Sequence, residues 1–318
     1  MTLLLGSMLV LIAMGIPVAF AIAVSGVTYL TLFESVPIAA IAQRMVVGVD
    51  SFTLLAIPLF LLAGTLMARG DITPKIMRLA SILVGRIPGG LAMVLVVSCM
   101  LFGAISGSGP ATTAAVGMLM IPAMTRRGYN PAYGGAITAA SGGIGIIIPP
   151  SIPMVIFGIS AMGIQVPEAA VARHGDFAGV SIPKLFVAGA VPGLIMAVAL
   201  IIANYVRSKK HGYLGLTDRW DVAEIGKAMR HGVWSLLAPF IILGGIYAGL
   251  FTPTESAVVA IAYTLVVGVF LHREMTWQKV WEALLSTTWI TGRVLLILFA
   301  ATVFGRVLVE EEIPARMA

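Results

Sequence analysis

Long apolar stretches separated by short polar connections make up almost the whole chain. Two of them contain no Asp, Glu, Lys, Arg or His: one covers 39 residues from Ile87 to Thr125, and the other runs from Gly128 to Pro167. An α-helix needs about 20 apolar residues to cross the hydrocarbon core of a bilayer, whereas the strands of a membrane barrel are shorter and alternate apolar with polar positions. The pattern therefore predicts an all-α, polytopic membrane protein.

Each of these two uncharged stretches is interrupted near its centre by residues that disfavour an α-helix. The interruptions are Gly103-Ala-Ile-Ser-Gly-Ser-Gly-Pro110 and Gly145-Ile-Ile-Ile-Pro-Pro-Ser151. An unsatisfied backbone amide or carbonyl costs several kcal/mol in hydrocarbon, so irregular backbone persists there only where protein or a water-filled cavity covers it. Two such breaks in adjacent segments indicate a solute site inside the membrane.

The charged connections predict on which side of the membrane each stretch begins and ends. The connection from Arg69 to Arg86 has a net charge of +3, and Arg126 and Arg127 follow the first stretch. Basic connections face the cytoplasm, so this stretch leaves and returns on one side. Two minimal spans fit this length, but the central break favours a re-entrant hairpin over residues 87–125, followed by a discontinuous helix over residues 128–167. Later spans are expected at residues 185–206, 232–250 and 256–271.

Composition and charge exclude other classes of protein. Apolar residues make up 59% of the chain and charged residues 11%, and the mean hydropathy is +1.02. The net charge of +6 would suggest nucleic-acid binding in a soluble protein, but here the basic residues are confined to connections between apolar stretches, so no nucleic-acid partner is expected. The first 33 residues are predicted to be retained in the membrane, with Gly15-Ile-Pro17 either splitting them into two short spans or kinking one.

We divide the chain into four parts on this basis. Residues 1–86 are N-terminal scaffold helices, 87–167 are half of a transport domain, 168–230 are connecting helices with a cytoplasmic loop, and 231–318 begin a second repeat. The repeat is a faint match, in which Gly64 and Gly305 are 241 residues apart and Pro74 and Pro314 are 240 apart. Transporters with inverted repeats place their sites between two such halves, and here the second repeat is expected to be incomplete.

The two breaks carry the candidate chemistry. Carbonyl and hydroxyl oxygens suit a hard, weakly held cation such as Na⁺, while free amides at a helix N-terminus suit a carboxylate. Close helix packing explains small residues, and a simple kink explains prolines, but the two breaks together favour a site. The candidate substrate-binding residues are Ser106, Gly107, Ser108, Gly109, Pro110, Thr112, Pro150 and Ser151. The candidate Na⁺ ligands are Ser106, Ser108, Ser141, Gly145, Ile148 and Pro149.

The sequence offers no support for an enzymatic function. The chain has no Gly-x-Ser-x-Gly, no His-Glu-x-x-His and no phosphate-binding Gly-Lys-Ser/Thr motif. The uncharged stretches contain no His or Lys that could activate a serine, so the chain is not expected to be an enzyme. Thr252-Pro-Thr-Glu255 is interpreted mainly as the cap of a helix.

Five segments, taken in order, resemble the large membrane subunit of tripartite ATP-independent periplasmic (TRAP) transporters. They are Asp50 to Gly64, Ser106 to Gly117, Arg127 to Pro131, Gly145 to Met154 and Leu250 to Glu255. The resemblance implies an elevator-type secondary transporter in a bacterial inner membrane that uses a Na⁺ gradient. It also implies two partners, a small four-helix membrane subunit and a soluble periplasmic protein that delivers an organic acid.

By the same resemblance, the hairpin tip and the unwound segment match the family's first Na⁺ site and one side of its substrate cavity. Nothing after Gly305 matches the family's second hairpin, so a C-terminally truncated chain is expected. The expected function is uptake of a C4-dicarboxylate or similar carboxylate, with no cofactor other than Na⁺ as coupling ion. A channel with re-entrant loops and a non-transporting membrane scaffold are the alternatives.

Overall fold

The computed structural model describes residues 2–34, 36–70, 72–161, 172, 180–216 and 222–311, and every regular element in these ranges is helical. The prediction of an all-α protein is therefore confirmed for this part of the chain. The chain forms two compact units, Met1–Leu54 with Thr288–Ala318 and Leu55–Thr287. The four-part division proposed above follows other criteria and stays a prediction.

The first unit contains α1 (Thr2–Ala13), α2 (Val18–Phe33), α3 (Ile38–Val47) and the C-terminal part of α14 (Trp277–Glu310). Its core is formed by Leu4, Tyr29, Leu30, Ile41, Val303 and Val307. The first apolar region is split into two short helices: α1 ends at Ala13, Gly15 has a φ of +83°, and Pro17 precedes α2. A positive φ favours glycine, and proline fixes the entry into the next helix, so this sequence separates the helices.

The second unit is built around α6. Its elements are α4 (Ala56–Arg69), α5 (Ile72–Val84), α6 (Gly90–Ser106), α7 (Gly109–Arg126), α8 (Pro131–Gly142), the 3₁₀ turn η2 (Gly143–Ile146), α9 (Ile152–Ala161), α11 (Ile182–His211), α12 (Val222–Tyr247), α13 (Pro253–Val266), the π-turn η4 (Val267–Leu271) and the start of α14, with the 3₁₀ turn η1 (Phe52–Leu55) at the border.

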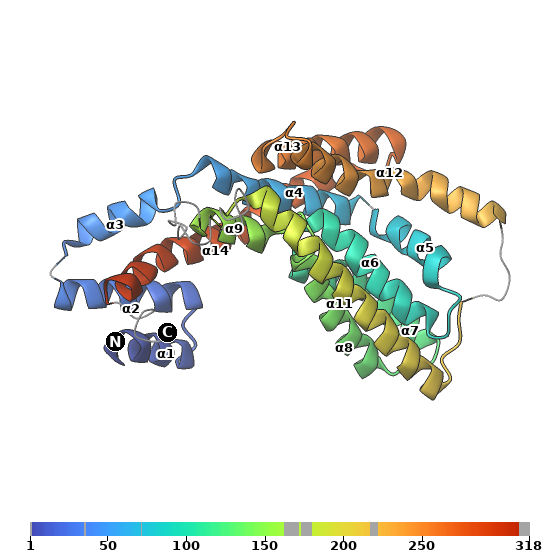
Figure 1. Cartoon of the computed structure of the whole chain (residues 1–318), viewed down its shortest axis with the longest axis horizontal. Helices are drawn as coiled ribbons and strands as arrows, with labels where there is room; N and C mark the ends of the chain where they lie inside the picture. Colours follow the sequence, from blue (N-terminus) through green and yellow to red (C-terminus); the bar gives the residue numbers. More distant parts are fainter. Residues whose placement is uncertain are drawn as a thin grey trace. The chain divides into compact units, whose positions relative to one another are not determined.

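Helix α6 is the centre of this unit because 15 of its 17 residues are buried. It packs against α5, α7, α8 and α11, and Figure 1 shows α6, α7, α8 and α11 running side by side. A helix that is apolar on all sides is expected to be surrounded by protein. The first arm of the predicted hairpin is thus a core helix of its unit.

Within the described residues, four helical segments are long and apolar enough to cross a membrane by length and composition. They are Phe52–Arg69, Ile182–His211, Pro253–Leu271 and Trp277–Glu310. The spans predicted at residues 185–206 and 256–271 fall on α11 and on α13 with η4, and the span predicted at 232–250 falls on the second half of α12 and the turn after Tyr247. The predicted discontinuous helix is described as α8, η2 and α9, and its residues 162–167 lie outside the described part of the chain.

Candidate solute site at two helix breaks

The hairpin tip is a two-residue link between α6 and α7. Gly107 ends α6 in the left-handed region with a φ of +61°, where a residue without Cβ is favoured. Ser108 then caps α7, its hydroxyl oxygen accepting the Ala111 amide at 3.4 Å. Pro110 lies in the first turn of α7, where its missing amide is not needed. The sequence Ser-Gly-Ser-Gly-Pro therefore ends one helix and starts the next within four residues.

The second break lies between η2 and α9, over residues 147–151. In a continuous helix, the Ile148 carbonyl would accept a hydrogen bond from the Ile152 amide. The Pro149 carbonyl would need a donor at residue 153, but residue 153 is a proline, which has no backbone N–H. The Ile152 amide instead donates to Gly107, and the Met154 amide donates to the hydroxyl of Ser151 at 3.4 Å. Among the described residues, no hydrogen bond is accepted by the carbonyls of Ile148, Pro149 and Pro150.

These two breaks touch each other through their backbones. The Ile152 amide donates to the Gly107 carbonyl at 3.1 Å, which joins the start of α9 to the hairpin tip. A Cβ atom on Gly107 would lie 2.6 Å from the carbonyl oxygen of Pro150, and one on Gly103 would lie 2.5 Å from Cα of Gly145. Only glycine allows such an approach, so these positions bring the irregular segments into direct contact.

Hydroxyl groups gather at the contact. The hydroxyls of Ser106 and Thr112 lie 3.1 Å apart, and Thr112 donates to the Ser108 carbonyl at 2.7 Å. Both Ser106 and Thr112 are buried. A Cβ on Gly145 would lie 2.6 Å from the Thr112 hydroxyl oxygen, so Thr112 faces the second break as well as the tip. The structure thus brings Ser106, Gly107, Ser108 and Thr112 together with Gly145 and Pro150.

Ser151 and Ser141, two further residues of the predicted site, differ in their hydrogen bonding. Ser151 donates its hydroxyl to the Ile146 carbonyl at 2.6 Å, so it stabilises the break itself. Ser141 lies in the last turn of α8 with no exposed surface, and its hydroxyl has no hydrogen-bond partner among the described residues. A buried polar group without a partner costs about 1–3 kcal/mol, so the Ser141 oxygen is available to a bound ion or water.

Two glycines that line the contact were not among the predicted site residues. Gly103 meets Gly145, as described above, and a Cβ on Gly64 of α4 would lie 2.8 Å from Cα of Ser106. Glycine inside an apolar helix costs about 1 kcal/mol relative to alanine, and this cost is the sequence signal that could have marked both positions.

The base of the hairpin is also held in place. The Gly89 amide donates to the Tyr213 carbonyl at 2.9 Å, and the Leu216 amide donates to the Gly85 carbonyl at 2.7 Å. The rings of Tyr129 and Tyr213 stack with centroids 4.1 Å apart. These contacts attach both ends of the hairpin to the segment after α11.

The site contains neutral oxygen atoms rather than charged groups. No Asp, Glu, Lys, Arg or His lies between Ile87 and Thr125. Within the described residues, no group of three or more His, Cys, Asp or Glu side chains could hold a metal ion. Its chemistry is therefore that of backbone carbonyls, hydroxyls and helix ends.

Comparison with known proteins gives one family. The family described as "Tripartite ATP-independent periplasmic transporter, DctM component" matches residues 5–318. An isethionate TRAP transporter permease of Oleidesulfovibrio alaskensis is 38% identical over 99% of this chain, which spans 47% of that relative. A C4-dicarboxylate TRAP transporter large permease of Rhodobacter capsulatus is 34% identical over 97% of the chain and 69% of its own length. A sialic acid TRAP transporter permease of Haemophilus influenzae is 35% identical over 98% of the chain and 47% of its own length.

The chain thus spans between about half and two thirds of the length of these relatives. All three relatives are transporter permeases by name and none is an enzyme, in agreement with the absence of enzyme motifs from the sequence. Together with the apolar helices, the match identifies a multi-pass membrane protein. The chain belongs to the DctM-component family of tripartite ATP-independent periplasmic transporters.

Proposed function

We propose that this chain acts as the large permease subunit of a Na⁺-coupled secondary transporter that takes up an organic acid. The observation that carries the proposal is the contact between the two helix breaks, made by the hydrogen bond from Ile152 to Gly107. Such a contact concentrates backbone oxygens that have lost their helical partners. Irregular backbone at membrane depth is tolerated where it lines a site, which supports a transport role for the contact.

Na⁺ would bind at the oxygen-rich side of this contact. The candidate ligands are hydroxyls of Ser106, Ser108 and Ser141 and carbonyls of Gly145, Ile148 and Pro149. The C-terminal end of α6 adds a partial negative charge, since its last carbonyls have no partners within the helix. Neutral oxygen ligands suit a hard monovalent ion, whereas His and Cys clusters suit transition metals.

The carboxylate would bind at the N-terminus of α7. The Gly109 amide is the first of that helix, and Ser106, Thr112, Pro150 and Ser151 lie nearby on the two breaks. A helix N-terminus favours an anion by about 0.3–2 kcal/mol. The names of the relatives give isethionate, C4-dicarboxylate and sialic acid, which are all organic acids, so a C4-dicarboxylate or similar carboxylate is proposed here.

Alternating access would follow from movement of a rigid block. The hairpin, α8, α9 and α11 are joined at the tip by the Ile152–Gly107 bond and at the base by the contacts with Tyr213, which favours their moving together as in an elevator mechanism. The remaining helices would act as the scaffold against which this block moves. A small four-helix membrane subunit and a periplasmic binding protein would be the partners in a bacterial inner membrane.

The test replaces Ser106 and Ser108 with alanine and measures substrate uptake into proteoliposomes that contain both partner subunits. The double variant is expected to need at least about tenfold more Na⁺ for half-maximal uptake, since two oxygen ligands are lost. Thr125→Ala is the control, because it removes a hydroxyl at the opposite end of α7, where that group donates to the Ile121 carbonyl at 2.9 Å. Unchanged Na⁺ dependence in the double variant would reject the assigned ligands.

The same preparation separates the two alternatives. A channel would conduct steadily without a Na⁺ gradient and without the binding protein. If the chain were a non-transporting scaffold, uptake would be the same with the natural chain and with the variant in which Ser106 and Ser108 are replaced by alanine.

A further inference from the structure

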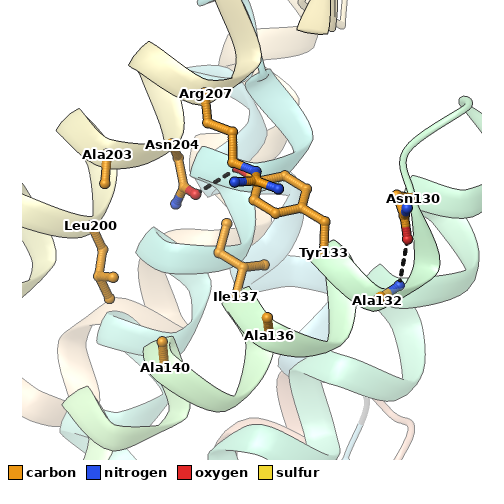
Figure 2. A pocket seen from close by; sticks show the side chains of 10 residues that line it. All are labelled: Asn130, Ala132, Tyr133, Ala136, Ile137, Ala140, Leu200, Ala203, Asn204 and Arg207. Atoms are coloured by element: carbon orange, nitrogen blue, oxygen red, sulfur yellow. Dashed lines mark hydrogen bonds between the residues drawn. The ribbon is translucent and has the colours of Figure 1, made fainter. Parts of the chain in front are cut away.

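A groove between α8 and α11 lies apart from the helix breaks and has a volume of about 450 Å³. It is lined by Asn130, Ala132, Tyr133, Ala136, Ile137, Ala140, Leu200, Ala203, Asn204 and Arg207 (Figure 2). None of the candidate Na⁺ or substrate residues is among them. The groove therefore needs an explanation of its own.

One end of the groove offers hydrogen-bond donors and a positive charge. Tyr133 donates its hydroxyl to Oδ1 of Asn204 at 2.7 Å, and the Arg207 guanidinium lies 5.0 Å from the centre of the Tyr133 ring. Asn204 is only 5% exposed, and its Nδ2 has no partner among the described residues. Figure 2 shows the amide oxygen of Asn204 turned to Tyr133 and the amide nitrogen pointing away from it.

This set of groups selects for an anion. Arg207 is exposed, and its guanidinium lies over the Tyr133 ring, an arrangement that favours a cation. Among the described residues, no carboxylate lines the groove and competes for the guanidinium. Guanidinium groups bind phosphate in a bidentate manner, and the free Asn204 amide supplies another donor next to it.

The other end of the groove is apolar. Ile137, Ala140 and Leu200 form its walls, and only 22% of the most apolar window of α11 is buried inside the structure. A free phosphate ion would leave this surface uncovered. A molecule with a hydrocarbon chain attached to a phosphate would cover both ends.

The place of the groove along α11 agrees with such a molecule. Arg207 is the first residue of the basic sequence Arg207-Ser-Lys-Lys210, near the end of a helix long enough to cross a membrane. The positive-inside pattern puts this end at the cytoplasmic surface, where anionic lipids are concentrated. We propose that the groove binds one anionic phospholipid, with its phosphate at Arg207 and Asn204 and an acyl chain along Ile137, Ala140 and Leu200.

Native mass spectrometry of the purified full chain tests this site without any transport assay. Phosphatidylglycerol and phosphatidylcholine are titrated separately, and inorganic phosphate is added as competitor. One phosphatidylglycerol is expected to bind in preference to phosphatidylcholine. Arg207→Gln should weaken this binding about fivefold or more, which is what one basic residue contributes to binding at an anionic membrane surface. Ala140→Phe should weaken it by filling the apolar end.

Lys210→Gln is the matched control, because it removes the same charge from the same helix end outside the groove. It should leave phosphatidylglycerol binding unchanged. Equal losses in Lys210→Gln and Arg207→Gln, or no loss in Ala140→Phe, would overturn the site. Displacement of the lipid by inorganic phosphate would show an anion site without a lipid, which also overturns the proposal. If Ala140→Phe does not purify, Ala203→Phe blocks the groove from α11, where Ala203 is exposed.

Discussion

At the scale of single residues, glycines hold the two helix breaks together by lacking a side chain. Gly107 combines a φ of +61° with a position where a Cβ would lie 2.6 Å from the Pro150 carbonyl oxygen. Gly103 and Gly145 meet backbone to backbone in the same region. The contact thus depends on three positions at which any larger residue must push the breaks apart.

Gly107→Ala should destabilise the protein by roughly 2 kcal/mol or more. The left-handed conformation costs an L-residue about 1–2 kcal/mol, and the overlap with Pro150 adds to it. Thermal unfolding of the purified protein in detergent measures the change. Gly143→Ala is the control, since no atom lies within 4 Å of a Cβ at that position and its backbone has a negative φ; equal melting temperatures for both variants would contradict the account.

Sequence could locate the breaks and suggest that they form one site, but not the residues that bring them into contact. Gly-Ser-Gly-Pro and Ile-Pro-Pro-Ser cannot continue a helix, so the end of α6 and the break before α9 follow from local chemistry. The approach of Gly64 to Ser106 depends on how α4 packs against α6, and nothing local to Gly64 specifies that packing. The hydroxyl of Ser141 has no hydrogen-bond partner among the described residues, and this too can be recognised only when its neighbours are known.

At the scale of elements, helix caps explain where several helices begin. The hydroxyl of Thr252 accepts the Glu255 amide at 3.3 Å, and the Glu255 carboxylate accepts the Thr252 amide at 2.8 Å. This capping box starts α13 and agrees with the interpretation of Thr252-Pro-Thr-Glu255 as a cap. The charge of Glu255 is thereby explained without a role in binding.

Thr252→Ala should lower the stability by about 1 kcal/mol, as for other N-cap replacements. Glu255→Gln should cost less, because glutamine also completes a capping box. Thermal unfolding and Na⁺-dependent uptake are measured for both. A loss of uptake without a loss of stability in Thr252→Ala would assign this motif a role beyond capping.

The two segments of the proposed repeat differ in their local structure, and the repeat itself stays a prediction. Gly64 lies in α4, which follows a non-helical segment around Asp50 and Ser51, whereas Gly305 lies in the continuous helix α14. Asp and Ser favour helix ends over helix interiors, because their side chains compete for backbone hydrogen bonds. The positions before Gly305 that correspond to them are Thr291 and Gly292, and the helix continues through both.

At the scale of the whole molecule, two compact units and the block around the hairpin carry the proposed function. Ion pairs join Arg69 to Glu282 and Lys75 to Glu274 within the second unit. They are partly exposed, and such pairs contribute about 0–1 kcal/mol, so the apolar core around α6 is the main stabilising feature. Hydropathy predicted this helical membrane architecture, because apolar runs of this length are stable only in a bilayer or a large core.

The central claim is that the joined breaks bind Na⁺, and thermal unfolding in matched Na⁺ and K⁺ concentrations tests it most directly. A ligand that binds only the folded state stabilises it by about 2.7 kcal/mol at 100 times its Kd. The melting temperature should rise with the logarithm of the Na⁺ concentration, not with K⁺, and the rise should disappear when Ser106 and Ser108 are replaced by alanine. Equal melting curves in Na⁺ and K⁺, or a Na⁺ effect that survives both replacements, would contradict the account.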